Sequence, residues 1–224
     1  MSLFSSSDPI MVVGAHPDDA ELGAGGLIAA AKQRGSPIAV VVLTRGEGGA
    51  SGTPEERIAE ARQAAAILGV DDWHCLELPD TAITDDLPSR EKLEAVLVQF
   101  RPRLIVTHGL EDWNQDHRNA SLLVDAAWSL ANRARRHGAA ALLRPRILHF
   151  HVDPLRAPPP DLLVDISPYA NRKREALEAF SSQREVLQLV MEWNRLRGAS
   201  MGVSFAEAFS SPEPLLAGSD LTLI

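Results

Sequence analysis

The amino-acid sequence predicts a single α/β domain, in which helices flank a largely parallel, Rossmann-like sheet. Short apolar runs rich in valine and isoleucine recur along the chain, and patterns typical of helices lie between them. Most of these runs show little alternation of polar and apolar residues, as expected for strands covered on both faces. With 224 residues, the chain can bury a full core of its own.

The predicted elements alternate along the chain. A strand over 9–15 precedes a helix over 20–34, and a strand over 37–43 precedes a helix over 54–68. Thr53-Pro54, with Glu56 in the first turn, is typical of a helix start. The remaining predictions are strands over 103–107, 146–151 and 161–166 and helices over 89–100 and 117–137.

The segments outside this alternation have simpler patterns. The tail over 168–197 predicts one or two amphipathic helices, and the glycine-rich stretch 46–52 predicts a flexible loop. Residues 157–160 form a proline-rich connector, and the polar residues 1–8 predict a flexible N-terminus within the single domain 1–224. The apolar tail positions expected in the core are Leu177, Phe180, Leu187, Val190, Trp193 and Leu196.

Charge and composition limit the classes of partner. The 22 Lys and Arg residues against 30 Asp and Glu give a net charge of -8, which argues against nucleic acid or an anionic membrane as the main partner. No apolar run approaches the roughly 20 residues needed to span a bilayer, and no signal-peptide pattern is present. A cytoplasmic location is the resulting expectation. The single cysteine, Cys75, is expected to be a small buried hydrophobic residue.

The first group with chemical potential is His16-Pro17-Asp18-Asp19, which follows the first predicted strand. Ligands of open parallel sheets bind outside the carboxyl ends of strands, and Pro17 stiffens the turn there. One interpretation is structural, with Asp18 as a helix N-cap and Glu21 as its capping-box partner. A cap needs one carboxylate, however, and does not explain His16.

The alternative interpretation is a metal site. An imidazole and a carboxylate three residues apart can share a zinc ion, which accepts nitrogen and oxygen ligands. A third ligand is available in Asp116-His117, which follows the strand predicted over 103–107. If the two strands are parallel neighbours, both motifs lie at one edge of the sheet. A helix cap followed by a surface histidine would also explain Asp116-His117.

Taken together, these motifs resemble the LmbE-like, or PIG-L, family of zinc-dependent de-N-acetylases that act on N-acetylglucosamine conjugates. The resemblance covers nearly the whole chain, with the motifs in the family's order. The matching residues are His16 to Asp19 with Gly25-Gly26, Thr44 to Glu47, Gly52-Thr53 with Arg57 and Glu60, Asp116-His117, and Ser204 to Phe209.

The resemblance implies a zinc ion held by His16, Asp19 and His117, with Asp18 as the general base. Three protein ligands leave a position for a water whose pKa the metal lowers, and Asp18 would accept the proton of that water. Attack on the acetamide carbonyl would release acetate and a free amine. The same donor set also suits Fe²⁺, so iron could replace zinc in the cell.

One departure from the family pattern affects the catalytic residues. Many members carry a histidine and a proline where this chain has Asn114 and Gln115. Asn114 could donate a neutral hydrogen bond to the oxyanion, but it cannot act as an imidazolium. Asp116, the matching catalytic carboxylate, thereby lacks the histidine that it would orient. His149 and His151 could supply an imidazole instead, or they could be ordinary residues at a strand end.

Three residues are predicted to contact the substrate: Arg57, Glu47 and His151. Arg57 matches a family arginine that contacts substrate, and a bidentate guanidinium would suit a carboxylate or phosphate group. Because Arg57 lies among acidic residues of one predicted helix, a solvated surface arginine is the competing interpretation.

Two other functions remain open from the sequence. A nucleotide- or sugar-binding module without hydrolase activity would explain the glycine-rich turns, although they lack G-x-G-x-x-G or Walker spacing. A family member with lost or shifted chemistry would explain Asn114. The expected partner is a small N-acetylated amino-sugar conjugate, and homo-oligomers are possible within the family. The aglycone stays open among malate conjugates, other glycoconjugates and chitooligosaccharides.

Overall fold

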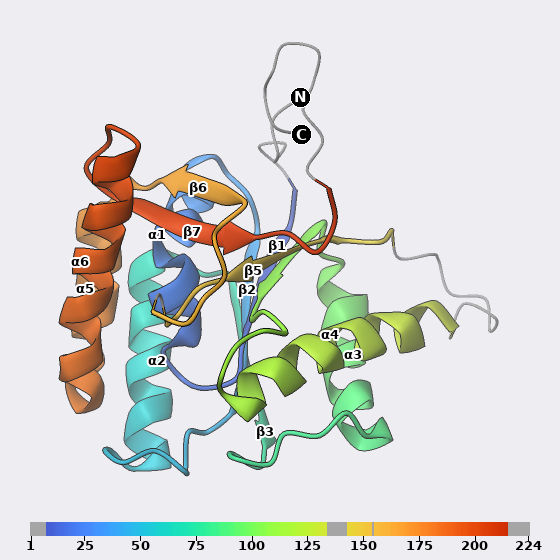
Figure 1. Cartoon of the computed structure of the whole chain (residues 1–224). Coiled ribbons are helices and arrows are strands. Elements are labelled where there is room, and N and C mark those ends of the chain that lie inside the picture. The colour runs from blue at the N-terminus through green and yellow to red at the C-terminus, as the bar shows by residue number, and fades with distance from the viewer. Residues whose placement is uncertain (1–7, 134–142, 154, 215–224) are drawn as a thin grey trace.

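The structure is a computed structural model, and it describes residues 8–133, 143–153 and 155–214. Seven strands form one sheet with helices on both faces (Figure 1). The strands are β1 (Ile10–Gly14), β2 (Ile38–Thr44), β3 (Asp72–Leu78), β4 (Leu104–Thr107), β5 (Arg146–Phe150), β6 (Leu162–Asp165) and β7 (Ala206–Ser210). The α-helices are α1 (Asp19–Gln33), α2 (Pro54–Leu68), α3 (Leu87–Phe100), α4 (Gln115–Arg133), α5 (Ala170–Glu178) and α6 (Arg184–Ser200), with 3₁₀ turns η2 (Ser167–Tyr169) and η3 (Ser181–Gln183).

The strand order is β3-β2-β1-β4-β5-β7-β6. The five strands from β3 to β5 pair in parallel, whereas β7 runs antiparallel to both β5 and β6. From β1 the chain builds outward through β2 to β3, and it then returns to place β4 on the other side of β1. The direction of construction therefore reverses between β1 and β4, which is where open α/β sheets bind their ligands.

The core lies on both sides of the sheet, because successive side chains of a strand point to opposite faces. In β1, Ile10 and Val12 pack with α1, α2 and α5, whereas Met11 and Val13 pack with α3 and α4. All residues of β1 and β2 are buried. These central strands are covered on both faces, which is why their sequence shows no polar alternation.

The glycines of α1 allow this helix to pack closely. A Cβ atom on Gly23 would lie 2.4 Å from the ring of Phe150, and one on Gly26 would lie 2.6 Å from Ile166. A buried ion pair lies against the same stretch of helix. Lys173 Nζ is 2.7 Å from Glu207 Oε1 and also donates to the carbonyl of Leu22 at 2.7 Å.

The other contacts of Glu207 complete this arrangement. Its carboxylate accepts the backbone N–H groups of Gly26 at 2.7 Å and Leu27 at 2.8 Å. In a regular helix the N–H of Gly26 would donate to the carbonyl of Leu22. Here Glu207 accepts from that N–H, and Lys173 donates to that carbonyl. The matched motif Ser204 to Phe209 thus contributes a strand whose glutamate anchors α1.

The predicted α/β fold is confirmed, but two strands were not predicted. β3 is an edge strand of mostly half-buried residues that include Trp, His, Cys and Glu, and β7 is short and contains the buried Glu207. Cys75 lies in β3 and is half-buried rather than fully buried. None of the described helices is long and apolar enough to cross a membrane.

The tail is confirmed as two amphipathic helices, α5 and α6. Leu177, Phe180 and Val190 are buried as predicted, and Trp193 is half-buried. The prediction for Leu196 is wrong, because this side chain is 50% exposed on the outer face of α6. The predicted flexible N-terminus, the end of the helix predicted to reach 137 and the side chain of Leu187 lie outside the residues that can be described.

Candidate metal centre

The turn after β1 places Asp18 in an unusual conformation. Asp18 occupies the N-cap position of α1 with a φ of 120°, a region that residues other than glycine rarely adopt. Its carboxylate makes no capping hydrogen bond, so the interpretation of Asp18 as a helix cap is wrong. Oδ2 instead lies 3.4 Å from Nη2 of Arg57. Such strain persists where surrounding contacts enforce it, and it is common at functional sites.

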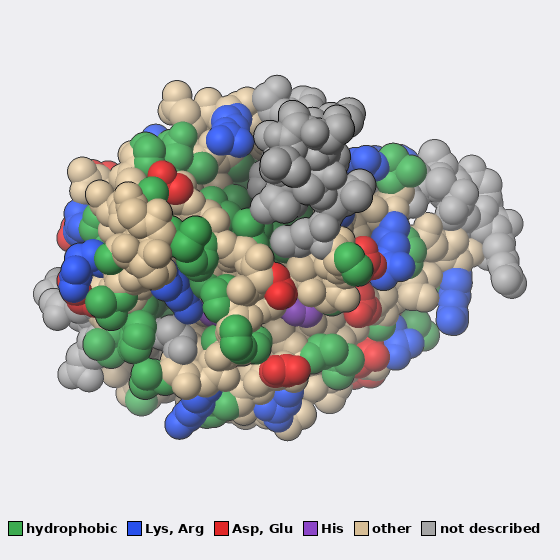
Figure 2. Space-filling model, turned by 45° about the horizontal axis from the view of Figure 1, so that its top comes forward, with side chains coloured by type: hydrophobic (Ala, Val, Ile, Leu, Met, Phe, Trp, Pro, Cys, Tyr) green, Lys and Arg blue, Asp and Glu red, His purple; other side chains and the backbone are tan. Residues whose placement is uncertain are grey.

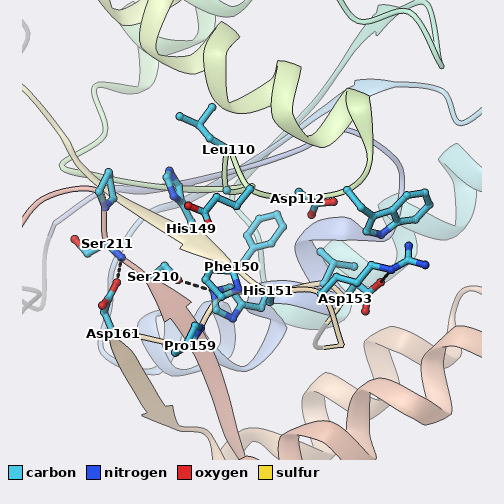
Figure 3. A pocket seen from close by; sticks show the side chains of 18 residues that line it. Leu110, Asp112, His149, Phe150, His151, Asp153, Pro159, Asp161, Ser210 and Ser211 are labelled. Atoms are coloured by element: carbon cyan, nitrogen blue, oxygen red, sulfur yellow. Dashed lines mark hydrogen bonds and ion pairs between the residues drawn. The ribbon is translucent and has the colours of Figure 1, made fainter.

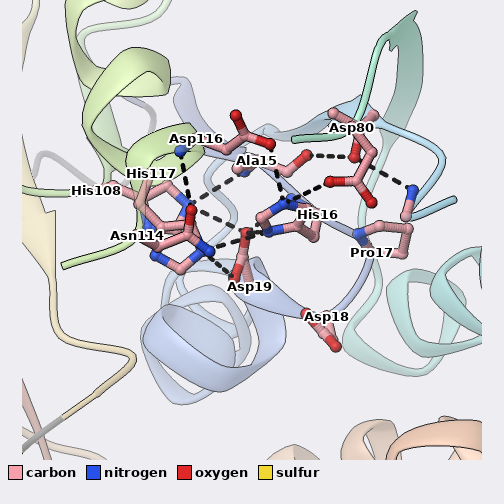
Figure 4. A network of polar contacts seen from close by, with 12 residues as sticks. Ala15, His16, Pro17, Asp18, Asp19, Asp80, His108, Asn114, Asp116 and His117 are labelled. Atoms are coloured by element: carbon pink, nitrogen blue, oxygen red, sulfur yellow. Dashed lines mark hydrogen bonds and ion pairs between the residues drawn. The ribbon is translucent and has the colours of Figure 1, made fainter. Parts of the chain in front are cut away.

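Three predicted metal ligands meet between β1 and β4 (Figure 4). His16 Nδ1 lies 3.3 Å from His117 Nε2 and 3.5 Å from Asp19 Oδ2, and His117 Nε2 lies 3.5 Å from Asp19 Oδ1. A tetrahedral ion with ligands at about 2.1 Å has about 3.4 Å between neighbouring ligand atoms. The two imidazole nitrogens therefore have the spacing of ligands on a tetrahedral metal such as zinc, and one oxygen of the Asp19 carboxylate lies close to each of them.

Two further carboxylates hold the opposite nitrogens of the two imidazoles. His16 Nε2 is 3.1 Å from Asp80 Oδ1, and His117 Nδ1 is 3.0 Å from Asp112 Oδ2. Carboxylates commonly orient metal-binding histidines in this way, because they fix which nitrogen keeps the proton. Asp80 follows β3, and Asp112 lies in the loop between β4 and α4.

His108 is a further member of the cluster, and the sequence analysis missed it. Its side chain is fully buried directly after β4, with Nε2 at 3.1 Å from Asp19 Oδ2 and 3.1 Å from Ala15 N. The imidazole stacks on that of His117 with centroids 3.8 Å apart. The available signal was a histidine at the carboxyl end of a buried strand, which is also the situation of His16.

Arg57 is buried and its guanidinium is engaged within the protein. Nη1 donates to the carbonyl of Gly46 at 2.8 Å, and Nη2 donates to the carbonyl of Pro17 at 3.1 Å. The solvated-arginine interpretation is therefore wrong, since only 5% of the residue is exposed. Gly46 must be small here, because a Cβ atom would lie 2.3 Å from Nη1. Contact between Arg57 and substrate stays a prediction.

Glu47 joins two loops at the rim of the cluster. Its carboxylate accepts the backbone N–H of Arg45 at 3.1 Å and that of Asp80 at 3.0 Å. The residue is exposed, and these two contacts position the loop that carries Asp80. A direct contact between Glu47 and substrate also stays a prediction.

Asn114 and Asp116 begin helix α4 beside the three ligands. Asn114 Oδ1 accepts the backbone N–H of Asp116 at 2.8 Å, which leaves the amide nitrogen available as a donor. Asp116 accepts the N–H groups of Thr81 at 2.6 Å and Ile83 at 3.2 Å, and its Oδ2 lies 3.5 Å from His16 Nε2. Asp116 thus holds the loop after β3 against the cluster, and the catalytic roles of both residues stay predictions.

His149 and His151 lie outside the cluster, in and after β5. Both line a neighbouring cleft that also includes Asp112. His151 Nε2 is 2.7 Å from Ser210 Oγ. The structure therefore does not place either imidazole among the three predicted ligands.

The excess of carboxylates gives the cluster a strong preference for positive charge. Burial opposes protonation of His16, but hydrogen bonds with Asp19 and Asp80 outweigh it and raise its pKa to about 11. Burial and the nearby Asp19 charge raise the pKa of Asp18 to about 7, although Arg57 opposes the shift. On the face shown in Figure 2, histidine side chains lie in a hollow with acidic side chains near it.

Comparisons with known proteins show what this chain is similar to. Residues 11–128 match the family model PIG-L, described as GlcNAc-PI de-N-acetylase. A 1D-myo-inositol 2-acetamido-2-deoxy-alpha-D-glucopyranoside deacetylase from Mycobacterium sp. (strain KMS) is 32% identical over 181 residues, covering 60% of this chain and 58% of that protein. The chain thus spans less than two thirds of that relative.

Two solved structures cover nearly the whole chain. A conserved protein from Thermus thermophilus is 36% identical with a TM-score of 0.84, covering 95% of this chain and 98% of that one. GalB, the 4-carboxy-2-hydroxymuconate hydratase from Pseudomonas putida KT2440, is 25% identical with a TM-score of 0.87, covering 95% and 99%.

Proposed function

The chain belongs to the PIG-L family of LmbE-like proteins, and on that premise we propose that it is a metal-dependent de-N-acetylase of N-acetylglucosamine conjugates. The observation that carries this proposal is the set of 3.3–3.5 Å separations among His16, Asp19 and His117. These atoms come from the turn after β1 and from the first turns of α1 and α4, at the switch point of the sheet, and their spacing suits one bound metal ion.

In the proposed reaction the metal would activate the carbonyl and the water, and the chain would transfer the proton. A bound divalent ion would polarise the acetamide carbonyl and lower the pKa of a water. Asp18 would accept the proton from the attacking water and return it to the departing amine as the C–N bond breaks, which releases acetate and an amino sugar.

The remaining residues have supporting roles in this proposal. Arg57 holds the carboxylate of Asp18 through its contact at 3.4 Å. The free amide N–H₂ of Asn114 could donate to the developing oxyanion, in place of the imidazole of other family members. We propose zinc as the metal, and the same two imidazoles and carboxylate also suit Fe²⁺.

The test combines metal analysis with an amine-release assay. Purified protein is expected to hold about one zinc or iron per chain, and to release amine from N-acetylglucosamine conjugates until a chelator is added. Asp18→Ala should keep the metal and lose most of the turnover, by a factor of about 10²–10⁴ for loss of a general base. His117→Ala should lose both. Equal turnover in wild type and Asp18→Ala would contradict the mechanism, and bound sugar without any turnover would favour a binding module.

A hydratase is the second candidate, because the GalB structure is similar over almost its whole length. The same assay plate should therefore include unsaturated hydroxy-carboxylic acids, with loss of enol absorbance as the readout. Metal-dependent loss of that absorbance, together with no amine release from any conjugate, would replace the de-N-acetylase proposal.

A further inference from the structure

A cleft of about 370 Å³ opens beside the metal centre (Figure 3), within the size range of small-molecule sites. The cleft and the cluster share a wall. Asp112 lines the cleft, and its carboxylate lies 3.0 Å from His117 Nδ1. Phe150 also lines it, with its ring 4.6 Å from that of His108. A ligand extending along the strand ends from the metal centre would therefore enter this cleft.

The charged groups of the cleft are mostly acidic. Arg156 is the one guanidinium among the lining residues, and it is already placed, with its Cζ atom 4.8 Å from the ring centroid of Trp113 and Nε 3.9 Å from Asp153 Oδ2. Burial lowers the pKa of both lining histidines, that of His151 to about 4, so both are neutral at pH 7. The lining carboxylates are Glu111, Asp112, Asp153 and Asp161.

One side chain in the cleft lacks a partner that its chemistry requires, and another exposes aromatic surface. His151 is only 9% exposed, and its buried Nδ1 has no hydrogen-bond partner within the described part of the chain. A buried nitrogen left unpaired costs stability, which a hydrogen bond with a ligand hydroxyl would recover. Trp113 is 56% exposed, and beside the contact of its ring with the Arg156 guanidinium it offers aromatic surface on which a ligand ring could stack.

We infer that this cleft holds the part of the substrate beyond the acetamido sugar, and that it takes an uncharged, hydroxyl-bearing ring rather than a carboxylate- or phosphate-bearing group. The hydroxyls would pair with His151, and one face of the ring would lie on Trp113. A carboxylate or phosphate on the aglycone would face the lining carboxylates, and like charges brought together at an interface weaken binding. This inference rests on the proposed function and narrows its substrate class.

The test compares two conjugates that share N-acetylglucosamine and differ in the aglycone, one joined to inositol and one to malate. We expect kcat/KM to be at least about tenfold higher for the inositol conjugate, a preference of about 1.4 kcal/mol. The preference should fall as salt is added. Equal or reversed values would overturn the inference, although amine release itself would still support the proposed function.

Variants separate the cleft from the metal centre. Glu111→Lys should reduce the preference, whereas Glu91→Lys makes the same charge change on α3 and should leave it unchanged. His151→Phe and Trp113→Ala should raise KM for the inositol conjugate by a larger factor than KM for the malate conjugate. An unchanged KM in both variants would also overturn the inference.

Binding gives a readout that does not depend on turnover. Calorimetry with the Asp18→Ala protein and each conjugate should give the lower Kd for the inositol conjugate. Tighter binding of the malate conjugate, or no binding of either, would contradict the inference even if no conjugate is hydrolysed.

Discussion

Asp80 and Asp112 set the tautomer and the ring orientation of the two imidazoles in the candidate metal centre. Each carboxylate lies about one hydrogen bond from the nitrogen that faces away from the other ligands. A neutral imidazole binds metal through its unprotonated nitrogen, so a carboxylate on the other nitrogen fixes the required tautomer and ring orientation. In the proposed metal centre these two residues would therefore act on the metal through His16 and His117 rather than by contacting substrate.

The first prediction concerns this orientation. Asp112→Asn should lower the affinity for zinc by a factor of about 10–100, because the amide orients His117 less firmly and no longer raises its basicity. Competition with a chromophoric chelator measures the affinity. Asp72→Asn is the matched control, since Asp72 pairs with His74 at 2.9 Å on the edge strand β3. Equal zinc affinity in wild type and Asp112→Asn would contradict the role.

The second prediction concerns the pH dependence of stability. Burial lowers the pKa of His151 to about 4, helped by Arg197 and His149 and opposed by Asp161 and Asp112. In the unfolded chain this pKa returns to about 6.5. Above about pH 6.5 the imidazole is neutral in both states, so its titration does not affect stability there. Between about pH 6.5 and 4 the unfolded chain takes up a proton that the folded chain does not, and the free energy of unfolding therefore falls as the pH is lowered.

His151→Gln removes this titration and provides the measurement. Between pH 7 and pH 4.5 the free energy of unfolding, from urea titrations, should fall more in the wild type than in the variant. A constant difference over this range would show that His151 titrates alike in both states.

At the scale of single elements, α1 carries the metal ligand Asp19 and depends on the buried pair between Lys173 and Glu207. Breaking a buried pair leaves an uncompensated charge and typically costs about 3–5 kcal/mol. Glu207→Gln should therefore lower the free energy of unfolding by about that amount. Glu192→Gln is the control, because its pair with Arg195 on α6 is exposed and such pairs contribute at most about 1 kcal/mol. Similar losses in both variants would contradict this account of α1.

The sequence predicted the elements that are buried on both faces and missed those that are not. β1, β2 and β4 read as continuous apolar runs, so their strands and parallel arrangement followed. β3 mixes polar and apolar residues because it lies at the edge of the sheet. Since β3 was not predicted, the loop that carries Asp80 could not be placed at the site.

The candidate site was likewise predicted in part. The two motifs were expected at one sheet edge from their position after predicted strands, and the resemblance to the family implied which three residues are ligands. The structure brings these three side chains together. The orientation of the buried Arg57 and the conformation of Asp18 depend on contacts between distant loops, which no local pattern encodes. The cleft residues beside β5 and β7 depend on the pairing of a strand that was not predicted.

At the scale of the whole molecule, binding of the metal should depend on the folded sheet and should therefore stabilise the native chain. His16 and His117 come together through the pairing of β1 with β4, so the native chain should bind the ion far better than the unfolded chain does. Zinc at 100 times its Kd should add about 2.7 kcal/mol of stability. For a chain of this size that amounts to a rise in Tm of roughly 5–10 °C.

Differential scanning fluorimetry with and without added zinc measures this rise. His117→Ala should show little of it. A full rise in that variant would mean that zinc stabilises the chain from another position.

The long stretch of chain that separates the two imidazoles also sets the order of events during synthesis. A ribosome releases the first histidine and its neighbouring aspartate long before the second histidine emerges. The growing polypeptide can hold the ion in its final environment only after the fourth strand has docked beside the first. Capture of a metal by the three proposed ligands would thus be deferred until more than half of the chain has been translated.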